Sequence, residues 1–61
     1  MNIYKITHES DFEFFWADSE EEATEKFKKA FPDCVVVKTE FVQKTNTAMF
    51  RSTMDGYILR I

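Results

Sequence analysis

The sequence of 61 residues contains one cysteine, one histidine, one glycine and one proline. A single cysteine excludes a disulfide within the chain, and with a single histidine it excludes a zinc site built from the usual Cys and His ligands. One glycine leaves no glycine-rich loop to hold a phosphate group. There is no apolar run of about 18 residues and no hydrophobic leader, so we expect neither a membrane span nor a signal peptide. A lone thiol suits a reducing compartment, and we expect a cytoplasmic protein.

The sequence is rich in aromatic residues, with seven Phe, two Tyr and one Trp. A chain of this length buries only about 60% of the surface that it exposes when unfolded. Aromatic side chains offset that small margin, since each can bury roughly 150–250 Å². No repeat or internal linker divides the chain, and we expect one domain that spans residues 1–61.

The N-terminal part of the chain has the pattern of a β-hairpin. Met1–Thr7 and Phe12–Trp16 alternate in the manner of two strands joined by a three-residue loop. That loop length places Ile6 opposite Phe14 and leaves Phe15 on the other face. We prefer this register because it collects most apolar side chains on one face of the sheet.

An amphipathic helix is predicted after the hairpin. Asp18 or Ser19 is its N-cap, because each is followed three residues later by a glutamate, as in a capping box. The helix runs to about Phe31, and Pro32 ends it. Its narrow buried stripe comprises Ala23, Phe27, Ala30 and Phe31.

Three further strands are predicted at Cys34–Lys44, Ala48–Met54 and Tyr57–Ile61. The turn at Asp55-Gly56 is the strongest hairpin signal in the chain, since a type I′ turn needs positive φ at both central residues. A tight turn at Thr45-Asn46 gives a register that agrees with it. The side chains of the first of these strands that should face the helix are Val37, Thr39 and Phe41. The predicted fold is a two-layer α+β domain of order ββαβββ, with one helix packed on an antiparallel sheet.

The sheet face away from the helix is the first candidate binding surface. It should combine apolar and charged side chains, and Arg, Met and aromatic residues beside aliphatic ones are typical of protein interfaces. Two interpretations of its charges stay open: a solvated salt-bridge row, or arginines that bind a carboxylate or phosphate of a partner. The candidate residues are Glu40, Val42, Met49, Arg51, Ile58 and Arg60, with Phe15 beside them.

The start of the helix is the second candidate surface. Between residues 9 and 25 there are eight acidic residues and no Lys or Arg. Acidic residues at a helix N-terminus complement the helix dipole, which explains part of this pattern. The alternative is an acidic surface directed at a basic partner. The candidate residues are Asp18, Glu20, Glu21, Glu22 and Glu25.

Catalysis is not expected. Cys34 and His8 lie in different strands with no motif that pairs them, and a small buried Cys is the simpler interpretation of Cys34. The consecutive acids Glu20, Glu21 and Glu22 fan around a helix and cannot form a facing acid/base pair. We expect no catalytic residue, no cofactor and no metal.

The stretch from Ile3 to Phe41 resembles small phage-encoded host-takeover proteins. The shared pattern is an N-terminal hairpin, a helix opening of the form Ala-Asp-Ser-x-x-Glu-Ala at residues 17–23, Phe31-Pro32, and a Val-rich strand. It looks most like the T7-type inhibitors of bacterial RNA polymerase, and its spacing is similar to that of some small anti-CRISPR proteins. The polymerase inhibitors contact their partner through arginines in the strand after the helix. This chain has Lys38-Thr39-Glu40 there, so those contacts do not carry over.

Together these patterns predict a small, non-enzymatic, protein-binding module. The resemblance implies a phage or prophage inhibitor of a host protein. Two alternatives stay open. One is a structural homodimer whose sheets associate through Val42, Met49 and Ile58. The other is a nucleic-acid-binding protein, against which the net charge of −3 counts.

Overall fold

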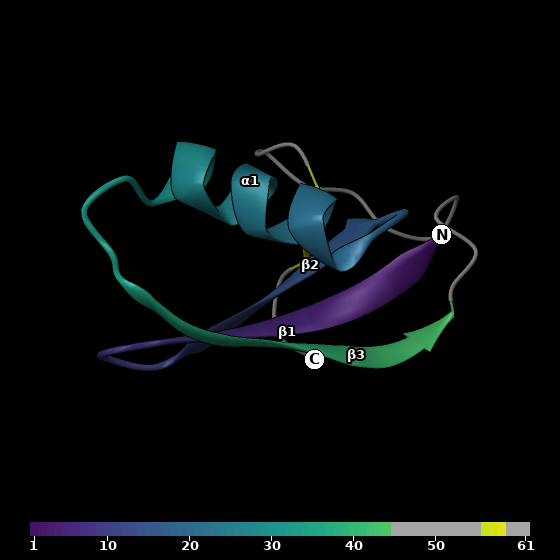
Figure 1. Ribbon diagram of the computed structural model, residues 1–61, viewed down its shortest axis with the longest axis horizontal. Coiled ribbons are helices and arrows are strands. Elements are labelled where there is room, and N and C mark those ends of the chain that lie inside the picture. Colours follow the sequence, from purple (N-terminus) through teal and green to yellow (C-terminus); the bar gives the residue numbers. More distant parts are fainter. Residues whose placement is uncertain (45–55, 59–61) are drawn as a thin grey trace.

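The computed structural model describes residues 1–44 and 56–58. This part of the chain contains β1 (Asn2–His8), β2 (Phe12–Ala17), α1 (Glu20–Ala30), β3 (Val36–Lys44) and β4 (Tyr57–Ile58). The strands form one antiparallel sheet of order β3-β1-β2-β4, and α1 lies across one face of it (Figure 1). The two-layer α+β fold predicted from the sequence is confirmed.

Several predicted features lie outside the described residues. These are the strand Ala48–Met54, the turn at Thr45-Asn46 with its register, the last residues of Tyr57–Ile61, and the side chains of Met49, Arg51 and Arg60. Gly56 is described and has a φ of +79°, in the region that favours glycine.

The helix begins and ends where the sequence predicts. Ser19 is the N-cap, and its Oγ accepts a hydrogen bond from the backbone N–H of Glu22 at 3.2 Å. The carboxylate of Glu22 accepts in return from the N–H of Asp18 at 2.7 Å. At the other end the N–H of Phe31 donates to the carbonyl of Phe27, just before the proline. Within the described residues no helix is long and apolar enough to cross a bilayer.

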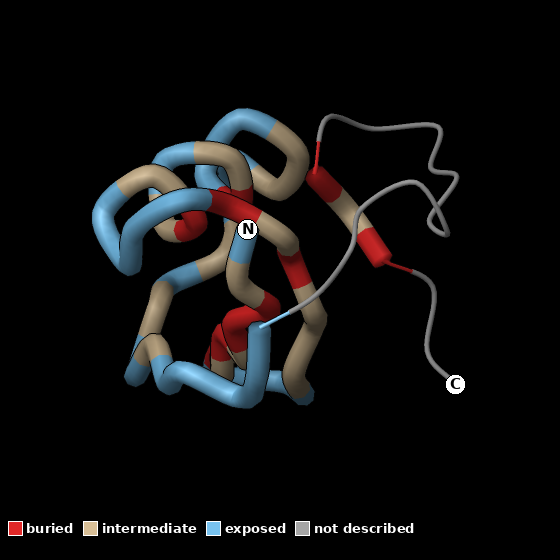
Figure 2. Tube along the Cα trace, turned by 90° about the vertical axis from the view of Figure 1, so that its right-hand side faces the viewer, coloured by how far each residue is buried: buried red, intermediate tan, exposed pale blue. Residues whose placement is uncertain are grey.

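The core lies between the helix and the sheet. The predicted helix stripe is confirmed, since Ala23 and Phe27 are fully buried and the stripe continues through the partly buried Ala30 and Phe31. Figure 2 marks the buried positions in red. The buried cluster comprises Tyr4, Ile6, Phe15, Ala17, Ala23 and Phe27.

The pairing of β1 with β2 differs by one residue from the predicted register. Ile6 lies opposite Glu13, not opposite Phe14. The cause is the turn. The N–H of His8 donates to the carbonyl of Asp11 at 2.9 Å, so the loop between His8 and Asp11 has two residues instead of the predicted three. A shift of one residue exchanges the two faces of a strand.

The prediction that Phe15 lies on the outer face is therefore wrong. Phe15 is fully buried beneath the helix, with its ring 5.9 Å from that of Phe27 in an edge-on arrangement. Phe14 takes the opposite side and faces away from α1, beside Ile58 of β4. The outer face of the sheet is consequently more aromatic than the sequence predicts.

The start of β3 also differs from the prediction. The strand begins at Val36, two residues after the predicted start at Cys34. A bulge in the pairing of β3 with β1 places Val36 opposite His8, where it packs against the core, and leaves Val37 exposed. The prediction that Val37 faces the helix is wrong because a bulge inserts an extra residue and reverses the alternation.

The remainder of β3 follows the predicted alternation. The hydroxyl of Thr39 lies 3.0 Å from that of Thr24 in α1, so Thr39 faces the helix. Phe41 lies on the same face, with its ring 6.0 Å from that of Tyr4. The residue between them, Glu40, points the other way, toward the candidate surface.

Candidate functional site

The face of the sheet away from the helix contains an apolar hollow. It has a volume of about 260 Å³. We refer to it as the outer hollow. All four strands contribute to it, and its lining consists of Ile3, Phe14, Val42, Gln43 and Ile58.

A second bulge in β3 shapes one wall of the outer hollow. Tyr4 pairs with Phe41 and Ile3 pairs with Gln43, so Val42 is the extra residue between them. Val42 is 45% exposed, whereas Ile3 is 5% exposed. The wall at Val42 is therefore available to a partner, while Ile3 already packs within the protein.

Ile58 was predicted to be a contact residue on this face, together with Val42 and Glu40. Its side chain is only 4% exposed, so it lines the outer hollow without projecting from it. The structure thus brings Val42 and Ile58 to one site, as the sequence analysis expects. Their predicted companions Met49, Arg51 and Arg60 lie outside the described residues.

A row of aromatic rings extends the surface along β2. Phe12, Phe14 and Trp16 alternate along β2 with the buried Phe15 and Ala17, and the first two rings meet edge to face at 5.5 Å. The ammonium of Lys5 lies 4.5 Å from the ring centre of Phe12. Lys26 reaches from the helix to Trp16, 4.0 Å from its ring centre, and donates to its carbonyl oxygen at 3.1 Å. These cation–π contacts order the lysines against the aromatic row.

The charges beside the outer hollow form a pair within β3. The ammonium of Lys38 lies 3.5 Å from the carboxylate of Glu40, and both side chains are exposed. An exposed pair of this kind adds little stability. Both side chains can therefore exchange their mutual contact for one with another protein.

The acidic start of α1 is a separate surface. A shallow polar concavity there has a lining of Glu20, Glu21, Thr24, Glu25 and Lys28. Glu22 does not contribute to it, because its carboxylate turns back to the N–H of Asp18. Helix capping therefore accounts for Glu22, one of the five acids predicted to contact a partner. The other four are exposed: Asp18, Glu20, Glu21 and Glu25.

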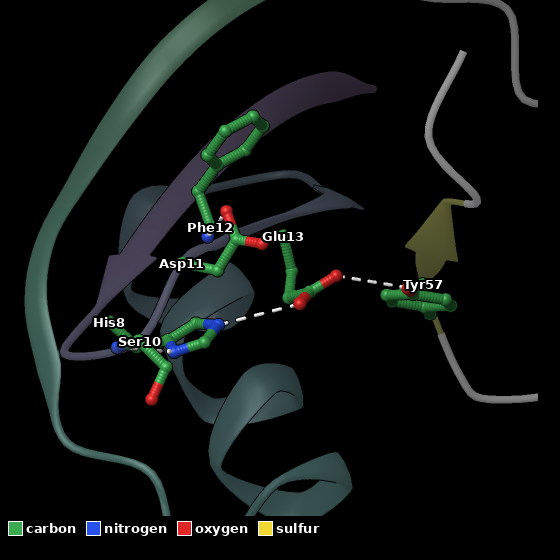
Figure 3. Close-up of polar contacts among 6 residues, drawn as sticks. All are labelled: His8, Ser10, Asp11, Phe12, Glu13 and Tyr57. Atoms are coloured by element: carbon green, nitrogen blue, oxygen red, sulfur yellow. Dashed lines mark hydrogen bonds and ion pairs between the residues drawn. The ribbon is translucent and has the colours of Figure 1, made fainter.

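A polar cluster that the sequence analysis did not single out lies on the helix side of the sheet (Figure 3). The carboxylate of Glu13 accepts from the hydroxyl of Tyr57 at 3.0 Å and lies 3.4 Å from Nε2 of His8. Nδ1 of His8 accepts from the N–H of Ser10 at 3.4 Å. A neutral imidazole that accepts at Nδ1 donates from Nε2, so His8 donates to Glu13. The sequence feature that could have indicated this cluster is Glu13, an acid between two phenylalanines and close to His8, the one histidine of the sequence.

This cluster is structural. The ring of His8 stacks on that of Phe27 at 5.5 Å, and the side chains of His8 and Glu13 are 8% and 15% exposed. Among the described residues no buried side-chain nitrogen or oxygen lacks a partner. The hydrogen bonds from His8 and Tyr57 therefore stabilise the Glu13 carboxylate on the helix side of the sheet, and the bond from Tyr57 connects β4 to the hairpin.

Residues 1–44 and 56–58 contain no group of three or more His, Cys, Asp and Glu side chains that could hold a metal ion. Cys34 is partly buried and packs against the core, and its N–H donates to the carbonyl of Phe31 at 3.1 Å. Its place in the turn after the helix agrees with a packing role.

Comparison with known proteins adds no assignment. No family model, no curated protein and no solved structure matches this chain. The resemblance to phage-encoded inhibitors rests on the sequence pattern alone.

Proposed function

We propose that this chain is a small, non-enzymatic module that binds a partner protein at the outer hollow. The observation that carries the proposal is an apolar lining with one half-exposed wall, Val42. Interfaces between proteins combine an apolar centre with a polar rim and are enriched in aromatic residues. The outer hollow has this composition, with Phe14 in its lining and Lys38 and Glu40 on the same face of the sheet.

The size of the outer hollow favours a protein side chain as its occupant. Small-molecule sites commonly measure about 300–1,000 Å³ and enclose most of the ligand. At about 260 Å³ the outer hollow lies below that range. An aromatic or branched apolar side chain of a partner would fill it, and the amide of Gln43 offers one hydrogen-bonding group beside that side chain.

The resemblance to phage-encoded inhibitors favours a host protein in the bacterial cytoplasm, which the module would inhibit by occupying its surface. Four exposed acids at the helix start supply attraction toward a basic region of that protein. They are Asp18, Glu20, Glu21 and Glu25.

Val42→Lys tests the proposal because it places a charge at the exposed wall without removing a buried side chain. The matched control is Val35→Lys, the same change at an exposed valine that is not part of the lining. We expect the wild type and Val35→Lys to capture the same host protein from a bacterial lysate. Val42→Lys should weaken binding to that protein about tenfold or more, because an ammonium opposes burial against an apolar partner. Calorimetry with the purified partner measures the difference.

Two results would count against this proposal. Equal affinity for all three proteins would place the binding site elsewhere on the chain. The second result would come from a gel-shift assay with a single-stranded oligonucleotide at low salt. A mobility shift that is larger with Val42→Lys than with the wild type would support nucleic-acid binding by the aromatic row of β2.

A further inference from the structure

Gly56, the residue before β4, lies at a point where β2, β4 and α1 meet. Its carbonyl accepts a hydrogen bond from the N–H of Trp16 in β2 at 2.8 Å. A Cβ atom at residue 56 would lie 2.6 Å from Cδ of Lys26 in α1 and 2.9 Å from the carbonyl oxygen of Trp16. Gly56 is buried, and its φ of +79° is a conformation that glycine adopts without strain. The chain therefore enters β4 through a space that Lys26 closes on one side.

The charged end of Lys26 fixes this side chain over Trp16. Its ammonium lies 4.0 Å from the ring centre of Trp16 and donates to the carbonyl oxygen of the same residue at 3.1 Å. A cation is attracted to the face of an aromatic ring, and a hydrogen bond from a charged donor is stronger than one from a neutral donor. Because both contacts fix the end of the side chain, its stem lies beside Gly56.

The attachment of β4 depends on such contacts because β4 is short. In the described part of the chain it has two residues, Tyr57 and Ile58, which pair with Phe15 and Phe14 of β2. A ladder of this length offers few backbone hydrogen bonds, and each adds only modest stability. Ile58 is at the same time one wall of the outer hollow. The position of that wall is set by how β4 is attached to β2.

We propose that Lys26 and Gly56 position β4, and with it the Ile58 wall of the outer hollow. This role rests on the proposed function, since it affects binding only if the outer hollow is the binding site. None of the described lining residues belongs to α1. Lys26 therefore gives the helix, which lies across the opposite face of the sheet, an influence on a surface to which it contributes no side chain.

Hydrogen exchange of backbone amides tests the role of Lys26 without a partner protein. The N–H of Trp16 donates to Gly56, so its exchange rate reports how often β4 separates from β2. Lys26→Met should raise this rate about tenfold, because it removes the charge and keeps an unbranched apolar side chain. Lys29→Met is the matched control at an exposed position of the same helix, and should stay within about twofold of the wild type. Lys26→Arg should restore protection, since a guanidinium also stacks on a ring and donates.

A second amide separates positioning from a general loss of stability. The N–H of Ala23 donates to the carbonyl of Ser19 within α1. It should exchange at the wild-type rate in Lys26→Met. Equal acceleration of the amides of Trp16 and Ala23 would overturn the proposal, and so would equal rates at Trp16 in Lys26→Met and Lys29→Met.

Gly56→Ala tests the link to the outer hollow. The added Cβ would meet a backbone oxygen, so β4 has to move. Nuclear Overhauser contacts between the Phe14 ring and the methyl groups of Ile58 should be lost, and a captured partner should bind about tenfold more weakly. Retention of those contacts would overturn the proposal. If Val42→Lys leaves partner binding unchanged, the proposed function fails, while the exchange and Overhauser measurements still decide whether Lys26 and Gly56 position β4.

Discussion

Phe15→Ala is expected to remove most of the stability of the protein, while Phe14→Ala leaves it folded. The ring of Phe15 is fully buried and lies against those of Phe27, Phe31 and Tyr57, at centre distances of 5.9, 6.4 and 5.4 Å. Deletion of a buried Phe side chain costs about 3–5 kcal/mol. A domain of this length has a free energy of unfolding of roughly 3–9 kcal/mol. Urea denaturation followed by circular dichroism measures both variants.

Phe14→Ala is the matched control because the two phenylalanines are neighbours on β2. Phe14 is only partly buried and lies on the outer face, so its deletion should cost less than half as much. The opposite order, with Phe14→Ala the more damaging change, would mean that β2 presents its other face to the helix.

Glu13→Ala is expected to lower the free energy of unfolding by about 2 kcal/mol, because it leaves two donors without their acceptor. The affected groups are Nε2–H of His8 and the hydroxyl of Tyr57. Tyr57→Phe removes the hydrogen bond to Glu13 together with its donor, and should cost about 1 kcal/mol. Chemical denaturation of the purified variants measures both losses.

Glu9→Ala is the control for this experiment. Glu9 is exposed in the hairpin turn, and a surface change of this kind stays within about 0.5 kcal/mol. If Glu13→Ala proved no more destabilising than Glu9→Ala, the polar cluster would not connect β4 to the hairpin.

Local signals predicted the helix and the fold class well. Ser19 with Glu22, and Phe31 before Pro32, specify the two ends of α1 through backbone hydrogen bonds and ring sterics that depend on few neighbours. The alternation of β1 was also predicted correctly, since Tyr4 and Ile6 face the helix. These features need no knowledge of distant residues.

The hairpin register could not be obtained from the same signals. The apolar pattern of the sequence favours Ile6 opposite Phe14 because that pairing keeps apolar side chains together, whereas the observed pairing places an acid beneath the helix. The structure accepts Ile6 opposite Glu13 because His8 and Tyr57 supply hydrogen bonds to the carboxylate. Tyr57 lies 44 positions along the chain from Glu13, so no local pattern shows the compensation.

The candidate site was predicted in part for a similar reason. Val42 and Ile58 were assigned to the outer face, and both line the outer hollow. Phe14 was assigned to the core because the register was one residue off. The bulge between Phe41 and Gln43, which brings Gln43 opposite Ile3 and into the lining, depends on how β3 pairs with β1, and the alternation of apolar residues does not reveal it.

The orientation of Phe14 tests the central claim most directly, because the outer hollow exists only if this ring faces away from the helix. Nuclear Overhauser contacts in the labelled protein report which protons lie close to the ring. We expect contacts from the Phe14 ring to the methyl groups of Ile58 and Ile3, and contacts from the Phe15 ring to Phe27. Contacts between Phe14 and Phe27 would contradict the account, since they would place Phe14 in the core and remove the proposed binding site.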